Sequence, residues 1–227
     1  MALRVASLWR YPVKSLAGEQ ISNAVLSPDG IPGDRIARVR GPEGVRTSRR
    51  QYRLIGLRGT LDAGGRPLIN GHRWDGPEAI ALVKEAAGRD AWLEAWEGVD
   101  RFDILPLLVA TDGAIAAFGR DRRRLRPNIV LGGVPGLAER AWEGRQVAIG
   151  DVVIALADLR GRCIVTTYDP DTVDQDVGVL LGIRAQFGGT LALNAWAGRS
   201  GRIAVGDAAE LLDAERPVDV PLVGRFA

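Results

Sequence analysis

The chain has 227 residues, with 30 Lys and Arg against 28 Asp and Glu, so its formal net charge is only +2. With 46% hydrophobic residues, this composition is typical of an ordinary globular protein, and its charge does not call for a polyanionic partner. One cysteine excludes an intrachain disulfide, and with one histidine it argues against a zinc site or a protein-only iron–sulfur cluster.

The N-terminal residues 1–12 do not resemble a targeting segment. They contain Arg4 and Arg10 and have no continuous apolar stretch, unlike a signal peptide or a membrane anchor. No part of the chain approaches 18 uninterrupted apolar residues. We therefore expect no membrane span and a cytoplasmic location, where a thiol stays reduced.

The first half of the chain predicts short strands followed by one helix. Strands are expected at 3–8, 21–26 and 35–40, separated by Pro-, Asp- and Gly-containing turns, and residues 59–76 are turn-rich β-structure. A helix is predicted over 77–87, with Asp75 as its N-cap and Gly88 as a left-handed residue after its end.

The second half predicts the same mixture. We expect a strand at 105–110, a helix capped by Thr111 or Asp112 and ending near 119, a strand at 129–131 and a helix over 175–187. Many short strands with two or three helices indicate a β-rich α+β fold. A domain boundary is expected near 97–103, which divides the chain into 1–98 and 99–227.

Cys163, the only thiol, is the most informative residue. A lone cysteine is most often a small buried hydrophobe. Cys163, however, follows Arg162 and opens the β-branched run 164–167, which predicts a strand. A thiol beside a guanidinium should have a lowered pKa, and its thiolate would suit either a soft metal or sulfur transfer. Any metal would have to bring most of its other ligands.

Several basic residues lie in patterns that suit an anion. Arg126-Pro127-Asn128 places a guanidinium and an amide at a rigid corner, and Lys14-Ser15 offers an ammonium beside a hydroxyl. The arginine-rich runs 46–53 and 120–126 are most often solvated surfaces, and too few aromatic residues interleave with them to favour nucleic-acid binding. His72 lies in a predicted surface turn, and nothing in its spacing favours a nucleophilic pair with Cys163.

Five segments in order resemble the MOSC proteins, the molybdenum-cofactor sulfurase C-terminal domain family that includes the amidoxime-reducing components. They are Tyr11-Pro12-Val13-Lys14-Ser15, Gly33-Asp34-Arg35, Arg124-Leu125-Arg126-Pro127-Asn128, Arg162-Cys163 with Thr166-Thr167 and Asp169-Pro170, and Val205-Gly206-Asp207. The resemblance runs from about residue 3 to residue 212. It implies a MOSC-type β-barrel, a smaller N-terminal β-rich domain and a cofactor cleft between them.

The resemblance also implies a molybdenum cofactor, Mo-molybdopterin. Cys163 would be the molybdenum ligand and catalytic residue, and the cofactor-binding residues would be Lys14, Ser15, Arg35, Asp103, Arg126, Asn128 and Arg162. The implied reaction is reduction of N-hydroxylated compounds, such as amidoximes, hydroxylamines and N-hydroxylated bases, by oxygen-atom abstraction at molybdenum. Electrons would come from a separate donor, a ferredoxin-like protein or a flavin or haem reductase.

The sequence departs from the family pattern at three places. Gly161 stands where some relatives have serine, Val173 replaces a usual glycine, and Gln51-Tyr52 replaces an acidic-Pro pair. These departures concern the substrate side of the site more than the metal ligand. Two other functions stay open: a sulfurtransferase that carries a Cys163 persulfide, and a non-catalytic carrier of the cofactor or an arginine-rich nucleic-acid binder.

Overall fold

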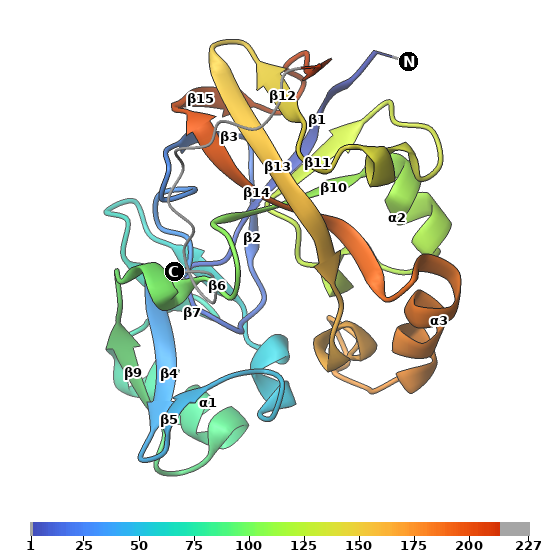
Figure 1. The fold of residues 1–227 in the computed structure, drawn as a ribbon. Helices are drawn as coiled ribbons and strands as arrows, with labels where there is room; N and C mark the ends of the chain where they lie inside the picture. Colours follow the sequence, from blue (N-terminus) through green and yellow to red (C-terminus); the bar gives the residue numbers. More distant parts are fainter. Residues whose placement is uncertain (1, 214–227) are drawn as a thin grey trace.

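The computed structural model describes residues 2–213, and its largest element is an eight-stranded sheet (Figure 1). The strand order is β16-β12-β13-β14-β10-β11-β1-β2, and every pair is antiparallel except β10 with β11. The strands are β1 (Arg4–Arg10), β2 (Glu19–Ile21), β10 (Leu107–Thr111), β11 (Ile129–Gly132), β12 (Gln146–Ile149), β13 (Val152–Gly161), β14 (Thr190–Arg199) and β16 (Glu210–Leu212).

This sheet curls so that its two ends approach each other. The segment 206–209, just before β16, exchanges backbone hydrogen bonds with Leu3 and Val5 at the start of the sheet's far side. A separate pair, β3 (Asn23–Leu26) with β15 (Gly201–Ala204), covers one end. The predicted β-rich α+β class is confirmed, although the strand pairing within residues 2–213 does not close a complete barrel.

The core of the large lobe is apolar and lies inside the curled sheet. Alternate residues of neighbouring strands meet there, among them Leu8, Leu107, Ile129, Ile154 and Leu193, all at most 1% exposed. Successive side chains of a strand point to opposite faces, so the apolar members of these strands share one interior. Burying each such side chain stabilises the fold by roughly 1.5–3 kcal/mol.

A smaller lobe below this sheet has its own core (Figure 1). It contains two three-stranded sheets, ordered β5-β4-β9 and β6-β7-β8, and the helix α1. The elements are β4 (Ala37–Gly41), β5 (Gly44–Arg46), β6 (Gly59–Leu61), β7 (Pro67–Ile69), β8 (His72–Arg73), β9 (Trp92–Ala95), α1 (Pro77–Ala87) and the 3₁₀ helices η1 (Tyr52–Gly56) and η2 (Val99–Arg101). β1 to β3 pair with one another and with strands of the large lobe, whereas Val13 and Leu16 belong to the core of the small lobe, so the earliest part of the chain contributes to both lobes. The division at 98/99 stays a prediction.

The three α-helices lie where the sequence predicts them. α1 spans Pro77–Ala87, but its N-cap is Gly76 and not Asp75, whose carboxylate is bound by Arg73. Gly88 has a positive φ of 109° with an extended ψ, so it is not the left-handed helical residue expected. The other helices are α2 (Asp112–Phe118), capped by Thr111, and α3 (Val177–Phe187), capped by Asp176. The chain also forms η3 (Arg122–Arg124) and η4 (Ala138–Ala141).

The strand predicted at 164–167 is wrong. These residues form the 3₁₀ helix η5 (Ile164–Thr167), and the strand β13 ends before Cys163 instead of beginning after it. The Thr166 hydroxyl donates to the Cys163 carbonyl at 2.8 Å, and the Thr167 hydroxyl donates to the Ile164 carbonyl at 2.7 Å. Such local side-chain bonds compete with sheet pairing and outweigh the β preference of the run.

The large lobe buries the carboxyl group of Glu139. Glu139 is fully buried, accepts a 3.2 Å hydrogen bond from the Thr111 hydroxyl through Oε2, and has no partner for Oε1. Burial raises the pKa of Glu139. The folded state therefore favours the protonated form of Glu139. The contribution of this protonated carboxyl to the free energy of unfolding is lost as pH rises through the raised pKa.

Glu139→Gln is expected to be more stable than the wild type at neutral pH, by about 1–3 kcal/mol, because the amide is buried without a charge. The gain should shrink as pH falls toward the ordinary carboxyl pKa. Urea denaturation at a series of pH values measures this difference. An equal effect at all pH values would contradict the assignment.

No helix among residues 2–213 is long and apolar enough to cross a membrane. The cytoplasmic location stays a prediction.

Candidate functional site

A cavity of about 630 Å³ lies where the two lobes meet, and it is lined from both. Residues of the small lobe, such as Thr47 to Arg49, face residues of the large lobe, such as Arg160 to Cys163. All eight predicted site residues line this cavity: Lys14, Ser15, Arg35, Asp103, Arg126, Asn128, Arg162 and Cys163. The structure thus brings together residues that are up to 149 positions apart in the sequence numbering, from Lys14 to Cys163.

The cavity wall is strongly basic. Two carboxylates, Asp100 and Asp103, line it together with six basic side chains: Lys14, Arg35, Arg49, Arg126, Arg160 and Arg162. Most of these cations are withdrawn from solvent; the side chains of Lys14, Arg35 and Arg160 are only 14%, 18% and 19% exposed. A concave wall with so many cations concentrates positive potential, which favours an anionic ligand.

Three cavity residues have strained backbones. Ser15, Arg35 and Arg126 have φ of 75°, 56° and 57°, in the left-handed region that non-glycine residues rarely adopt. Such strain costs about 1–3 kcal/mol per residue and persists only where the surrounding structure enforces it. Its concentration at three residues of one cavity indicates that the fold aims these side chains at a ligand.

Asp103 organises one side of the cavity. Its carboxylate binds Lys14 Nζ at 2.8 Å and Arg49 Nη2 at 2.9 Å, and Arg160 Nη2 lies 3.6 Å away. Burial opposes the charged form, but the attraction of Lys14, Arg49 and Arg160 prevails and holds the pKa of Asp103 well below its usual range. Burial lowers the pKa of Lys14, and the Asp103 charge opposes that change. The pair therefore stays ionised and orders the cations around it.

Cys163 is half-buried, lines the cavity and lies beside two arginines. It follows Arg162, and the pKa of Arg49 is raised first by Asp103 and additionally by hydrogen bonding and charge interaction with Cys163. A sulfur ligand here would thus be surrounded by donors and positive charge.

Arg162 holds an unsatisfied donor at the cavity. Its Nη2 donates to the Leu125 carbonyl at 2.7 Å, whereas its buried Nε has no hydrogen-bond partner within the described chain. Burial, together with the nearby charge of Arg160, lowers the pKa of Arg162 to about 10. A buried guanidinium with a free donor is costly, and an anionic group in the cavity would satisfy it. The residues present therefore fit an anionic, metal-bearing cofactor that needs one thiolate.

Two family comparisons agree with this geometry. Residues 2–100 match the MOSC N-terminal beta barrel domain, and residues 114–210 match the MOSC domain. Together the two matches include residues of both lobes and most of the cavity lining, although Asp103 and its neighbours lie between them. The chain is a MOSC-domain protein.

Curated relatives of this MOSC protein include two amidoxime-reducing components. It is 27% identical to mitochondrial amidoxime-reducing component 1 of Homo sapiens, in an alignment covering 74% of this chain and 67% of that protein. It is also 27% identical to the Mus musculus protein of the same name, covering 74% and 66%. The chain thus spans about two thirds of the length of these relatives.

A solved structure shares the fold. The YUAD protein from Bacillus subtilis is 14% identical, with a TM-score of 0.52, covering 93% of this chain and 96% of that one.

Tyr11 and Asp34 are two buried residues of the MOSC protein that contact the cations of the cavity. The family motifs include both residues but did not assign either of them a role. The guanidinium groups of Arg35 and Arg126 both lie over the Tyr11 ring, at 5.3 and 4.4 Å from its centroid, and the Tyr11 hydroxyl donates to the Pro127 carbonyl. Asp34, 1% exposed, pairs with Arg35 and accepts from the Tyr11 amide at 2.7 Å. Burial raises the pKa of Tyr11 to about 12, so its hydroxyl stays neutral.

The side chain of Asn128 binds backbone groups of neighbouring strands, a structural role that its sequence motif did not predict. Its Oδ1 accepts from the Leu108 amide at 3.2 Å, and its Nδ2 donates to the Trp9 carbonyl at 3.3 Å. These bonds join β1, β10 and the start of β11 at the cavity floor. The proposed contact of Asn128 with a cofactor stays a prediction.

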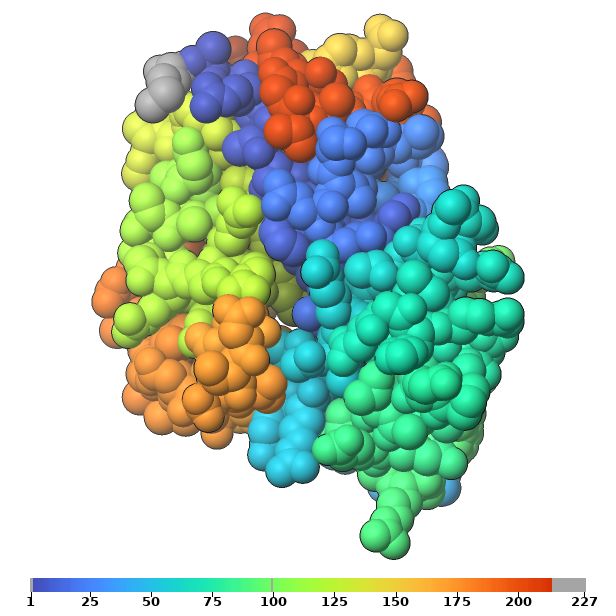
Figure 2. Space-filling view, turned by 180° about the vertical axis from the view of Figure 1, so that it is seen from behind, coloured from blue at the N-terminus to red at the C-terminus, as the bar shows by residue number. Residues whose placement is uncertain are grey.

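Two of the three sequence departures, Tyr52 and Val173, lie at the seam between the lobes, whereas Gly161 lines the cavity. Tyr52 stacks on Tyr168 with centroids 5.0 Å apart, and a Cβ on Gly56 would lie 2.9 Å from Val173 Cγ2. Figure 2 shows this seam from behind, with the segment 50–56 in cyan beside the loop near 173 in orange. Val173 has a φ of 65°, which explains why glycine suits that position in the family.

The ionised Asp103 predicts a pH effect. Because its folded-state pKa is depressed, its contribution to stability is present above the ordinary aspartate pKa of about 3.9 and is lost as pH falls through the lower folded value. The difference in unfolding free energy between wild type and Asp103→Asn should therefore be constant at neutral pH and shrink in acid. Denaturation from neutral to acidic pH measures it; a difference that grows in acid would contradict this.

Proposed function

We propose that this MOSC protein binds a molybdenum cofactor and reduces N-hydroxylated compounds such as amidoximes. The observation that carries the proposal is the placement of the only cysteine in a cavity with six basic side chains. The similarity to the amidoxime-reducing components supports the class of reaction. A separate protein would deliver electrons.

The residues divide into a metal side and an anion side. Cys163 would ligate molybdenum, and Lys14, Ser15 and Arg35 would hold the pterin and its phosphate, with Arg126, Asn128, Arg162 and Asp103 as further contacts. When bound, the cofactor would supply a metal that accepts an oxygen atom and exchanges two electrons.

The chain's own residues would prepare this site. Tyr11 and Asp34 orient Arg35 and Arg126, so the cations would not have to be ordered when the ligand enters. The Asp103 carboxylate favours the proton on Lys14 Nζ, against the effect of burial. The enclosing walls of the two lobes would exclude water from the reacting groups.

The test uses the full chain from a molybdate-supplied host. Metal analysis, fluorescence of the released pterin, and conversion of benzamidoxime to benzamidine with reduced methyl viologen are measured on one preparation. We expect molybdenum and pterin in similar amounts, together with turnover. Cyanolysable sulfur without pterin would contradict the proposal and indicate a sulfurtransferase. Bound cofactor without turnover of N-hydroxylated compounds would contradict it and indicate a carrier of the cofactor.

A further inference from the structure

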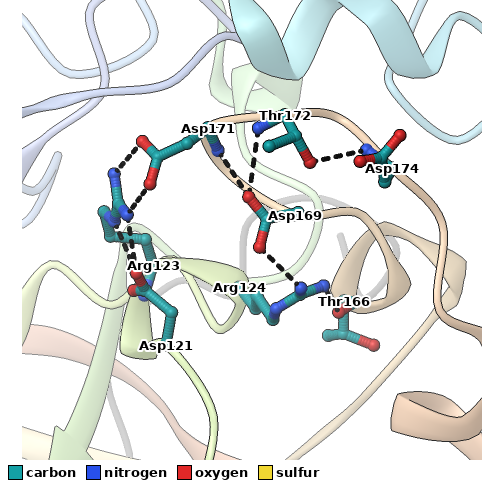
Figure 3. A network of polar contacts seen from close by, with 8 residues as sticks. All are labelled: Asp121, Arg123, Arg124, Thr166, Asp169, Asp171, Thr172 and Asp174. Atoms are coloured by element: carbon teal, nitrogen blue, oxygen red, sulfur yellow. Dashed lines mark hydrogen bonds and ion pairs between the residues drawn. The ribbon is translucent and has the colours of Figure 1, made fainter.

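The segment that begins at Arg162 is fastened to the segment 122–125 by a small polar network, part of which is drawn in Figure 3. Arg124 Nη1 donates to the Thr166 carbonyl at 3.3 Å, and its Nη2 donates to Asp169 Oδ2 at 2.9 Å. In the opposite direction, Arg162 donates to the Leu125 carbonyl at 2.7 Å. Each segment therefore supplies one arginine that binds a backbone carbonyl of the other.

Asp169 connects this clasp to the loop after η5. Its Oδ1 accepts from the amides of Asp171 and Thr172, at 2.9 and 3.1 Å, while Oδ2 receives Arg124 (Figure 3). The Arg124 side chain is only 9% exposed. A nearly buried, two-pronged guanidinium contact has a defined geometry, unlike an exposed ion pair.

The network reaches Cys163 within a single turn. Thr166, whose carbonyl is held by Arg124, binds the Cys163 carbonyl twice, from its amide at 3.0 Å and from its hydroxyl at 2.8 Å. Neither Arg124 nor Asp169 lines the cavity. The direct route from these two residues to the thiol is therefore the backbone of η5, through the Thr166 carbonyl.

We propose that Arg124 and Asp169 are positioning residues that fix the direction in which Cys163 presents its sulfur to the cavity. The proposal rests on the proposed function in that Cys163 is taken as the metal ligand. Without the clasp, η5 would keep its local bonds and the bonds that Gln175 and Asp176 donate to Thr167 at its far end from Cys163. The turn next to Cys163 would then depend on its local bonds, and short 3₁₀ turns have little stability of their own.

The chain offers a matched control in the neighbouring residue. Arg123 also joins the two segments, through Asp171 at 2.6 Å, and it binds the adjacent Asp121 at 2.6 Å, but its side chain is 37% exposed and that of Asp171 is 67% exposed. Exposed pairs of this kind contribute little to stability. Arg123→Gln thus removes the neighbouring arginine of η3 and its bond to the loop after η5. It leaves the bond from Arg124 to the backbone of η5 in place.

The test compares Arg124→Gln, Asp169→Asn and Arg123→Gln. In cofactor-free protein, the rate at which Cys163 reacts with Ellman's reagent at one neutral pH should rise about fivefold or more in the first two variants, and stay within about twofold in the control. In cofactor-loaded protein, the ratio of molybdenum to pterin and the Mo(V) electron paramagnetic resonance spectrum should change in the first two only.

Asp169→Asn retains an acceptor for the loop amides, so it keeps the test valid if Arg124→Gln does not fold. Wild-type thiol rates and spectra in a folded Arg124→Gln or Asp169→Asn protein would overturn the proposal. Since the thiol measurement uses cofactor-free protein, it does not depend on whether Cys163 binds molybdenum. A failure of the proposed function would instead appear as a wild-type protein that lacks molybdenum and pterin.

Discussion

Cys163→Ala protein from a molybdate-supplied host is expected to contain less than about a tenth of the wild-type molybdenum and to show no turnover of an amidoxime. The physical reason is that the chain has no other thiol, and no neighbouring side chain of the cavity can replace a soft thiolate ligand. The pterin should decrease less than the metal, because the six basic side chains that would hold its anionic groups remain.

The matched control for this variant is Val165→Ala. Val165 lines the same cavity two residues away and has no group that could bind a metal. It should retain molybdenum and pterin near the wild-type ratio, measured by metal analysis and pterin fluorescence. Full molybdenum content and activity in Cys163→Ala would refute the assignment of the metal ligand and with it the proposed function.

Arg162→Met is expected to change the stability of the cofactor-free protein little and to weaken binding of the pterin strongly. In the cofactor-free protein it removes a cation whose buried Nε has no hydrogen-bond partner in the described chain, at the cost of one hydrogen bond to Leu125. Its unfolding free energy should therefore be no more than about 1 kcal/mol below that of the wild type, and an increase would be in keeping with the removal of an unpaired charge. Retention of pterin should fall about tenfold or more, because a charge-assisted contact is lost.

The measurements are thermal unfolding of cofactor-free protein and pterin content after gel filtration. Arg50→Met is the control: Arg50 is exposed, lies outside the cavity lining and should change neither quantity. If Arg162→Met kept its pterin, or lost both stability and pterin to a large extent, Arg162 would be a structural residue and not a binding residue.

The sequence correctly predicted the helix ends that are set by neighbouring residues in the chain. Pro77 at a first helical turn and Thr111 at an N-cap act within one turn of chain, and both predictions agree with the structure. The run 164–167 shows the limit of such signals. Its β-branched residues favour a strand, but two threonine hydroxyls and the clasp from Arg124 make it a 3₁₀ helix.

The residues of the candidate site were found through the family motifs, and the structure places all eight at one cavity. Arg49 and Arg160 were not predicted: Arg49 lies in the arginine-rich run 46–53, which is typical of a solvated surface, and Arg160 lies outside the matching motifs. Only the fold shows that both face Asp103, which comes from a third segment. Tyr11 and Asp34 lay within the matching motifs, but their support of Arg35 depends on packing.

The sequence by itself thus determined the chemistry that is available: a single thiol, an excess of arginine over lysine, and motifs that resemble the MOSC family. Only the tertiary structure decided that the thiol opens into a cavity and is not buried as a small hydrophobe. The reason is that a cavity is formed by segments far apart in the chain, and their approach is set by the packing of two separate cores, which no local pattern encodes.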